Sequence, residues 1–249
     1  MINTLVKRLA PVAAIALSAA VAGCGDMNIE INGEEGVPLA ELDTTGDAPT
    51  EFVLAGPDQV VLTEGDNLEI DVEGDSDAVD LVRFSNKDGT LAVSRANGKW
   101  DDVGTAIVRV TMPAPTSIVI AGSGSVEAAT MAEEADITIA GSGRADVSGL
   151  EVSKLQVTIA GSGSMSAAGA AEQMELTIAG SGQSRMADLT VGNAEVSVVG
   201  SGDASFASDG NVEATIMGSG NVTVTGDASC TISSMGSGSL NCKSVEPAE

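Results

Sequence analysis

From Phe52 onward, apolar and polar residues alternate along short stretches that end in glycine. The clearest stretch, Ile137–Gly143, reads ITIAGSG, and nearly the same string returns at 157–163 and 176–182. Alternation of β-branched residues with polar ones predicts β-strands that bury one face. The glycines predict sharp bends after these strands, because a Cβ would hinder the positive φ angles or close backbone approach of a tight corner.

The Gly-Ser-Gly triplet recurs seven times, with its first glycine at positions 122, 141, 161, 180, 200, 218 and 236. A nearly constant spacing of 18 to 20 residues is typical of a solenoid. Residues two, four and six positions before this glycine, and four and six after it, are mostly apolar. These residues would face a shared interior. Each coil is therefore expected to contain a strand, the Gly-Ser-Gly bend, a second strand and a return turn.

Such coils cannot bury an apolar face alone, but they can when they stack in parallel about 4.8 Å apart. The sequence thus predicts an all-β, single-domain parallel β-helix with coils of ~19 residues, right-handed like other parallel crossovers. Residues 117–249 form its regular Gly-Ser-Gly part. Residues 50–116 are expected to form irregular coils that cap the N-terminal end, with a hairpin turn at Lys87–Thr90.

A family resemblance rests on these same stretches. A strand into Ala55-Gly56, a Lys-Asp-Gly-Thr-Leu turn at 87–91, a Val-Thr-Met-Pro step at 110–113 and then the serial Gly-Ser-Gly copies are its marks. Together they resemble the bacterial auto-transporter adhesin, head GIN domain family over residues 50–242. The resemblance implies an exported or lipid-anchored envelope protein with a β-helical fold. It implies adhesion through the family name, and it brings no catalytic residues.

Composition narrows the chemistry. The formal net charge is -25, from 11 basic and 36 acidic residues, and the chain has no His and no Tyr. Such a field repels phosphate backbones, so we expect no nucleic-acid partner. The commonest general base and metal ligand is absent. Aromatic residues make up 2%, which leaves few platforms for sugar rings.

The first residues predict export. Lys7 and Arg8 precede an apolar run that is shorter than the roughly 20 residues of a membrane span. Small residues then lead into Cys24, which resembles a lipobox. We therefore expect 1–23 to be a lipoprotein signal peptide and Cys24 to carry the fatty-acyl (palmitate-type) anchor. Gly25 favours an outer-membrane destination by resemblance to sorting rules. Residues 24–49 are expected to be a flexible acidic tether.

An outward column of the predicted helix is acidic. Glu175, Glu195 and Glu213 stand five positions before the glycine in successive coils, so they should stack about 4.8 Å apart. Carboxylates suit a hard cation such as Ca²⁺, but a solvated acidic stripe is the simpler interpretation. No cofactor is therefore expected. The neighbouring column carries hydroxyl residues such as Thr158 and Thr177, which suit a solvent-facing strand.

Cys230 and Cys242 lie six residues to either side of Gly236, both on the inward parity. They should face each other across the last coil, and in an oxidising periplasm they could form a disulfide. Two buried free thiols are the alternative.

Two functions remain open at this level. The first is a non-catalytic, lipid-anchored envelope protein that presents a rigid acidic rod to a protein or surface ligand. Its ends could also pair with one another, because edge strands are exposed there. The tail from Lys243 to Glu249, with Pro247 and two acids, could instead block this pairing. The second is a polysaccharide-binding or polysaccharide-cleaving β-helix. Cleavage would need basic residues near a base, and Arg144 and Arg185 are the candidates.

Overall fold

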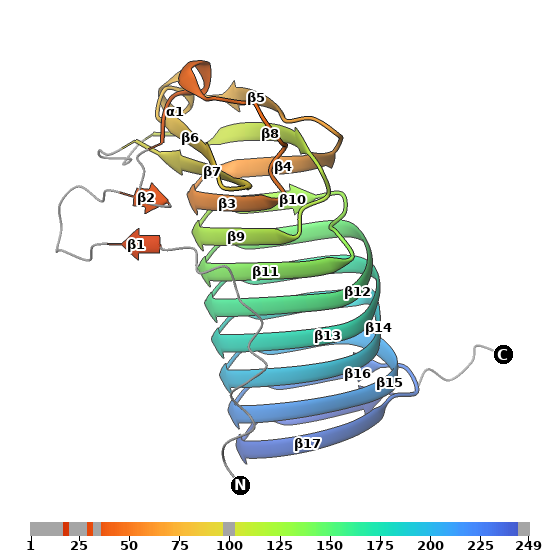
Figure 1. The fold of residues 1–249 in the computed structure, drawn as a ribbon. Helices are drawn as coiled ribbons and strands as arrows, with labels where there is room; N and C mark the ends of the chain where they lie inside the picture. Colours follow the sequence, from red (N-terminus) through yellow and green to blue (C-terminus); the bar gives the residue numbers. More distant parts are fainter. Residues whose placement is uncertain (1–16, 20–28, 32–35, 97–102, 244–249) are drawn as a thin grey trace, which may run out of the picture.

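The computed structural model describes residues 17–19, 29–31, 36–96 and 103–243. These residues form a rod of stacked strands, with one short α-helix at the end where β5 to β8 lie (Figure 1). The predicted parallel β-helix is confirmed. Among the described residues, no helix is long and apolar enough to cross a membrane.

The strands before the regular coils are β1 (Leu17–Ala19), β2 (Ile29–Ile31), β3 (Glu51–Gly56), β4 (Gln59–Glu64), β5 (Glu69–Gly74), β6 (Val82–Lys87), β7 (Thr90–Arg95) and β8 (Ala106–Met112). The coils consist of β9 (Ser117–Gly122), β10 (Ser125–Ala128), β11 (Glu134–Gly141), β12 (Arg144–Gly161), β13 (Ser164–Gly180), β14 (Gln183–Gly200), β15 (Asp203–Gly218), β16 (Asn221–Thr225), β17 (Ser229–Gly236) and β18 (Ser239–Lys243). The helices are the 3₁₀ helix η1 (Leu39–Glu41) and α1 (Ser76–Val79).

The coils stack in the register that the sequence predicts. Ile139 pairs with Ile120 on one side and with Ile159 on the other, and the glycines Gly122, Gly141 and Gly161 pair in the same ladder. The apolar columns face inward as predicted: Ile120, Ile139 and Ile159 are fully buried. One continuous core therefore runs along the rod, filled mainly by aliphatic side chains.

The expected return turn is a third strand segment, so that part of the prediction was wrong. In β12 the chain stays in strand conformation from Arg144 to Gly161. Leu150 and Val152 in its middle are buried, between exposed corners at 148–149 and 154. Register shifts in this middle segment absorb the variation in coil length. Each regular coil thus contributes apolar side chains from three short segments.

The Gly-Ser-Gly corner requires glycine because of its positive φ angle and because the backbones of stacked coils approach closely there. Gly161 has φ +123°, a region that side chains other than glycine rarely adopt. A Cβ at Gly161 would also meet the carbonyl oxygen of Gly141 in the coil beneath. The corner N–H groups bond to the preceding coil, as Ser162 N does to Gly141 O at 2.8 Å. Stacked corners therefore approach too closely for any larger residue.

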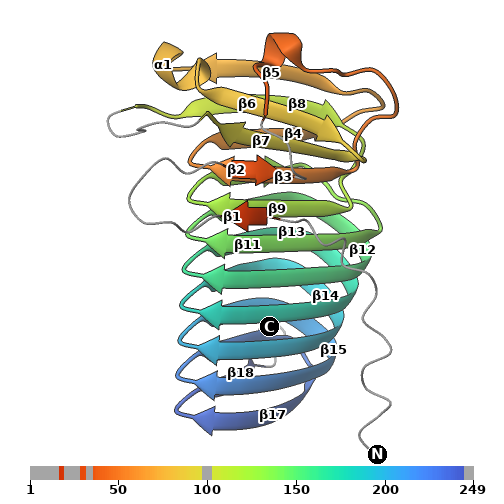
Figure 2. The same ribbon diagram turned by 60° about the vertical axis from the view of Figure 1, so that its left-hand side comes forward.

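The N-terminal end is closed by a cap that departs from the coil pattern. Strands β3 and β4 form one more coil, in register with β9 and β10. Above it lie β7 and β8, and then β6 and β5, which pair antiparallel with β7 and β8 respectively. The predicted hairpin at Lys87–Thr90 is confirmed, with positive φ at Asp88 and Gly89. Figure 2 shows these strands at the end opposite to β17.

Part of the segment expected to be a flexible tether is packed on the cap. Val37 forms an antiparallel bridge to Phe84, with both N–H···O distances at 2.8 Å. Leu39 and Leu42 pack against the core. The reason is their apolar character, which the acidic neighbours concealed in the sequence. The packed domain therefore begins near Val37 rather than at residue 50. Strands β1 and β2 pair antiparallel with each other.

The C-terminal end has no comparable cover among the described residues. Strands β17 and β18 each pair with the preceding coil and with no strand beyond it. Ile232 is 45% exposed, although Ala214, its partner at the inward position one coil earlier, is fully buried. Met235 in the outward column is 71% exposed. The interior of the β-helix therefore reaches the surface at this end.

Candidate functional site: the acidic column and the charged contacts of the rod

The proposed lipid-attachment residue, Cys24, lies outside the described residues, as does the signal segment up to residue 16. The remaining candidates lie on the rod. Its outward side chains form columns along the stack, because each coil repeats the same orientation of residues.

The predicted acidic column exists as a ladder. Glu175 pairs in register with Glu195, and Glu195 pairs with Glu213. All three side chains are exposed. Asp136 and Gln156 continue the same column toward the cap. The strand spacing thus brings together residues that lie 18 to 20 positions apart in the sequence.

A second polar column runs beside the first and was not singled out from the sequence. Gln173 pairs with Asn193, and Asn193 pairs with Asn211. The amide of Asn211 donates a hydrogen bond from Nδ2 to Oδ1 of Asn193 at 3.2 Å. The signal was available, since each residue stands two positions before a ladder glutamate. Amides and carboxylates together line an open groove of about 530 Å³, with Lys154 near the end toward the cap.

The groove presents hydrogen-bond acceptors and negative charge, but its side chains do not form a coordination shell for a metal ion. Among the described residues, no group of three or more His, Cys, Asp or Glu is arranged to hold a metal ion. What the groove can do chemically is accept hydrogen bonds from hydroxyl, amine or amide groups of a partner.

Asp136 differs from the other acids of its column because it is half-buried. Loss of hydration raises the pKa of its carboxyl above the ordinary value of 3.8, and Glu175 adds to this. The hydrogen bond that Thr138 Oγ1 donates to Asp136 Oδ1 at 3.3 Å, and the charge of Lys154, act in the opposite direction. The carboxylate of Asp136 is therefore held at some cost to the folded state.

The arginines that glycan cleavage would require are held by neighbours on their own strands. Arg144 Nε lies 3.0 Å from Asp146 Oδ2. Arg185 donates to the side-chain oxygen of Gln183. Asp146 and Arg185 line a second open groove of about 470 Å³ on another face. Both arginine side chains are therefore held by local contacts, beside a shallow surface.

The cap contains a charged contact that the sequence analysis missed. Arg95 in β7 donates to Asp58 from Nε at 2.8 Å and from Nη2 at 2.5 Å, and both side chains are 1% exposed. Asp58 also accepts from Ala106 N at 2.8 Å, and Arg95 donates to Gly104 O at 2.8 Å. The sequence contained one indication of this contact, because Gly56-Pro57-Asp58 stands where later coils have Gly-Ser-Gly. The pair joins the first coil to β7 and β8.

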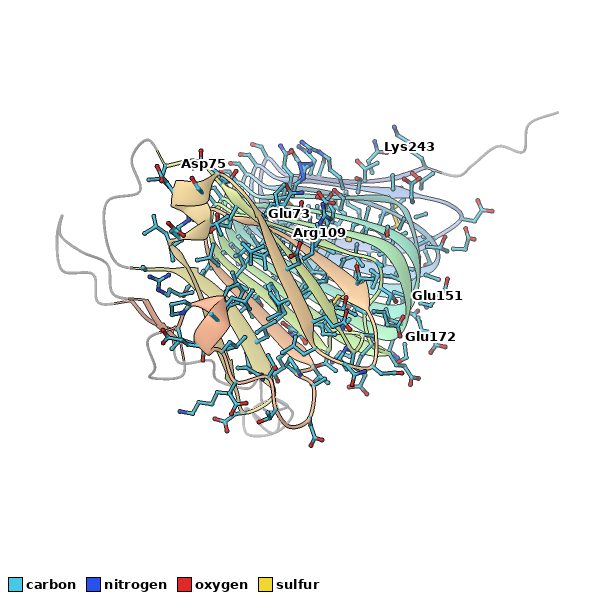
Figure 3. The ribbon with its side chains drawn as sticks, turned by 90° about the horizontal axis from the view of Figure 1, so that it is seen from above. Glu73, Asp75, Arg109, Glu151, Glu172 and Lys243 are labelled. Atoms are coloured by element: carbon cyan, nitrogen blue, oxygen red, sulfur yellow. A yellow bond between two sulfur atoms is a disulfide. The ribbon has the colours of Figure 1, made fainter. Side chains whose placement is uncertain are left out.

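A contrasting pair lies on the cap surface. Arg109 of β8 and Glu73 of β5 approach to 3.7 Å with about half of each side chain exposed, and Figure 3, which looks down the rod from the cap, shows them side by side. Glu151 and Glu172 project from the outer edge of the coils in the same view. An exposed pair of this kind contributes little, about 0 to 1 kcal/mol.

The two inward cysteines of the last coil are paired in the structure. Cys230 of β17 and Cys242 of β18 form a disulfide with 6.7 Å between their Cα atoms. The bond crosses the interior of the last described coil. It links the two strands at this end, where the described residues pack from one side only.

Comparisons with known proteins agree with this architecture. A putative adhesin from Bacteroides fragilis has a TM-score of 0.72 and 22% identity, covering 80% of this chain and 94% of its own. A putative lipid binding protein from Parabacteroides distasonis has a TM-score of 0.60 and 22% identity, covering 79% and 93%. A putative adhesin from Parabacteroides merdae has a TM-score of 0.59 and 21% identity, covering 82% and 94%.

These likenesses show a shared fold. No curated protein matches the chain. The family described as "Putative auto-transporter adhesin, head GIN domain" matches residues 48–228, a range that takes in strands β3 to β8 of the cap, six of the seven Gly-Ser-Gly corners and the acidic column. The chain is therefore a member of the auto-transporter adhesin, head GIN domain family.

Proposed function

We propose that the protein is a non-catalytic, lipid-anchored protein of the cell envelope that uses its acidic β-helix for adhesion or ligand binding. The observation that carries this proposal is the repetition of outward polar columns over successive coils. Such columns give a long, rigid and chemically uniform surface, which suits contact with an extended partner. The adhesin family and the adhesin-like envelope location that it suggests support the same function.

The anchor is proposed from the sequence alone. Small residues lead into Cys24 after a basic start and a short apolar run. Two or three acyl chains at this cysteine would hold the protein firmly, because each buried CH₂ contributes about 0.8 kcal/mol. Gly25 makes the outer membrane the proposed destination. The cap then lies nearest to the anchor, since the chain enters the packed domain at Val37 beside β6.

Anchoring is tested by growing cells with an alkyne-labelled palmitate and measuring label on the purified chain. Label is expected on the parent chain and on Cys230→Ser, and it is expected to be lost in Cys24→Ser. Fractionation of the envelope then gives the membrane. Label that persists in Cys24→Ser, or a parent chain recovered only in soluble fractions, would contradict the proposal.

Ligand binding is tested on the groove between the two polar columns. Cells that display the parent chain are compared with Asn193→Ala, which removes a groove amide, and with Asn221→Ala, which removes an exposed amide outside it. Binding to a panel of neutral, amino and acidic glycans and to immobilised envelope proteins is measured. Weaker binding only for Asn193→Ala supports the groove. Equal binding by both variants shows that another surface is used, and release of glycan products would favour an enzyme.

Calcium is tested separately. We expect excess Ca²⁺ to leave the unfolding curve unchanged, because the exposed column is proposed as a solvated stripe. A calcium-dependent rise of the midpoint that disappears in Glu195→Gln would instead indicate a cation site.

A further inference from the structure

The C-terminal end of the rod combines three features that occur together nowhere else among the described residues. The strands β17 and β18 have one edge each without a paired strand. Apolar side chains reach the surface there, at Ile232 and Met235. The coil itself, residues 228–243, contains no aspartate or glutamate. Each feature bears on what can bind at this end.

Unpaired strand edges need hydrogen-bond partners or protection. Natural sheets usually protect such edges with charge, proline, bulges or a covering segment. Strand β17 reads SCTISSMG at 229–236 and contains no charged residue and no proline. An edge of this kind is a template for another strand.

Charge determines which strand can approach. The chain has a net charge of -25, so two copies repel each other along their acidic sides. The last coil is the exception, because its one charged residue is Lys243. End-to-end contact therefore places the uncharged coils together and the acidic columns far apart.

Symmetry supplies a suitable register. A two-fold axis through the edge of β17 sets this strand antiparallel to the same strand of a second copy. When Ile232 faces Ile232 of the second copy, inward residues oppose inward residues along the whole strand. The exposed part of Ile232 is then covered, and the apolar interior continues from one rod into the other.

The apolar surface beside the edge of β17 also favours contact with a second copy. Val199, Met217 and Met235 stack in register in the outward column next to the corner glycine. Their exposure is 42%, 42% and 71%, so it is greatest in the last coil. In this register Met235 lies opposite Ser229 of the second copy, so pairing of the two strands covers part of its flexible, exposed thioether.

We infer that two copies of this protein bind each other end to end through β17 and β18, and that this contact joins two membranes. The second step rests on the proposed lipid anchor. The chain enters the packed domain at β6, which lies at the opposite end of the strand order from β17 and β18. Pairing at the C-terminal ends therefore places the two anchors at opposite ends of the joined rod.

The first experiment measures self-association without the anchor. The full chain carrying Cys24→Ser is sedimented over a range of concentrations at low and high salt. Dimers are expected, and raising the salt should tighten them, because screening reduces repulsion between the acidic rods. A weak protein contact has a dissociation constant on the order of 100 µM. A chain that stays monomeric at about this concentration overturns the inference. Dimers that dissociate as salt rises also overturn it, since they would depend on opposite charges.

Variants locate the contact. Ile232→Asp places a charge at the centre of the proposed interface and should weaken association at least tenfold. Ser234→Asp does the same at a residue that is already polar and exposed, so folding is not at risk. Thr215→Asp is the matched control, because it adds the same charge to an exposed residue one coil earlier. Equal behaviour of Ile232→Asp and Thr215→Asp would place the contact elsewhere.

The second experiment tests the joining of membranes. Two populations of vesicles with different dyes are loaded with the acylated chain, and flotation first measures whether the protein is bound to them. Absence from floated vesicles contradicts the anchor and leaves the sedimentation result standing. With protein bound, mixed clusters of both dyes are expected for the parent and for Thr215→Asp, and not for Ile232→Asp. Bound vesicles that fail to cluster would show that the ends do not pair across membranes.

Discussion

The two ends of the rod solve the same problem in different ways. At the N-terminal end, β5 to β8 and α1 cover the first coil, and the cap breaks the coil pattern to do so. At the C-terminal end, β17 and β18 keep the coil pattern to the last described strand, and no strand beyond them covers it. A repeat thus extends a core readily, whereas closing that core requires residues that the repeat does not contain.

The chemistry that stabilises each end follows from this difference. The cap is covered on both faces, so it can bury a charged pair, Asp58 and Arg95, with full hydrogen bonding. Within the described part of the chain the last coil is packed from one side only, and a disulfide between Cys230 and Cys242 joins its two strands. Substitutions at the two ends should therefore differ in how far their effects spread.

The largest effect is expected from breaking the buried pair of the cap. Arg95→Met keeps an apolar stem but leaves Asp58 buried without its cationic partner, which should cost about 3 to 5 kcal/mol. Because the pair joins β4, β7 and β8, the whole cap should loosen together. Urea unfolding gives the free energy, and hydrogen exchange should show lost protection over residues 51–112.

The matched control for that variant is Arg109→Met. Arg109 forms an exposed contact with Glu73 at 3.7 Å, so its loss should cost well under about 1 kcal/mol. If both variants lose the same stability, the buried pair does not hold the cap together.

The next largest effect concerns the corner of the regular coils. Gly161→Ala adds a Cβ at φ +123° that meets the backbone of the coil beneath. Strain at positive φ and overpacking each contribute, so the cost should be about 3 to 4 kcal/mol. Gly89→Ala provides the comparison, because Gly89 also has positive φ but has no atom within 4 Å of an added Cβ. The difference between the two unfolding free energies measures the contact term; equal values would show that φ alone requires glycine.

The disulfide at the open end should have a smaller and local effect. Cys230→Ser with Cys242→Ser opens a loop with a sequence separation of 12. Loop entropy then predicts a loss of about 3 kcal/mol at most. Exchange protection should fall over residues 229–243 and stay unchanged in the cap. A thiol titration of the parent chain without reductant should find neither thiol free; two free thiols would contradict the pairing.

The repeat explains how much the sequence could predict. Side-chain alternation and the spacing of glycines specify the coil register, the inward columns and the ladder from Glu175 to Glu213, because the same sequence pattern recurs in every coil. The sequence pattern of the cap occurs only once, so no repetition reveals its contacts. The Asp58–Arg95 pair joins residues 37 positions apart with no repeat to reveal it, and the docking of Val37 depends on a single bridge. The third strand segment was missed because its length varies between coils.

A gain of stability is expected inside the regular coils. Ser184 occupies an inward position between Met165 and Ala204, and its Oγ is buried without a hydrogen-bond partner among the described residues. Ser184→Ala removes an unsatisfied group, which should raise the free energy of unfolding by about 1 kcal/mol. Ser205→Ala, on the outward face of the neighbouring coil, should leave it nearly unchanged. A loss of stability in Ser184→Ala would show that the hydroxyl holds a buried water.

The smallest effect depends on pH and concerns the half-buried acid of the outer column. Burial raises the pKa of Asp136 above its ordinary value of 3.8, so the folded state binds a proton more readily than the unfolded state does. The favourable contribution of this group is therefore complete below pH 3.8 and is lost as pH rises through the folded pKa.

Asp136→Asn should thus be slightly more stable than the parent at pH 7, by under about 1 kcal/mol. The difference should vanish at low pH, where the Asp136 carboxyl of the parent is protonated in both the folded and the unfolded state. The asparagine oxygen can still accept from Thr138, so the hydrogen bond is kept. Glu213→Gln removes the same charge from an exposed place in the same column. If both variants gain equally at pH 7, relief of charge repulsion along the column explains the effect. A gain confined to Asp136→Asn shows that burial determines it, and that the column is solvated everywhere except near the cap.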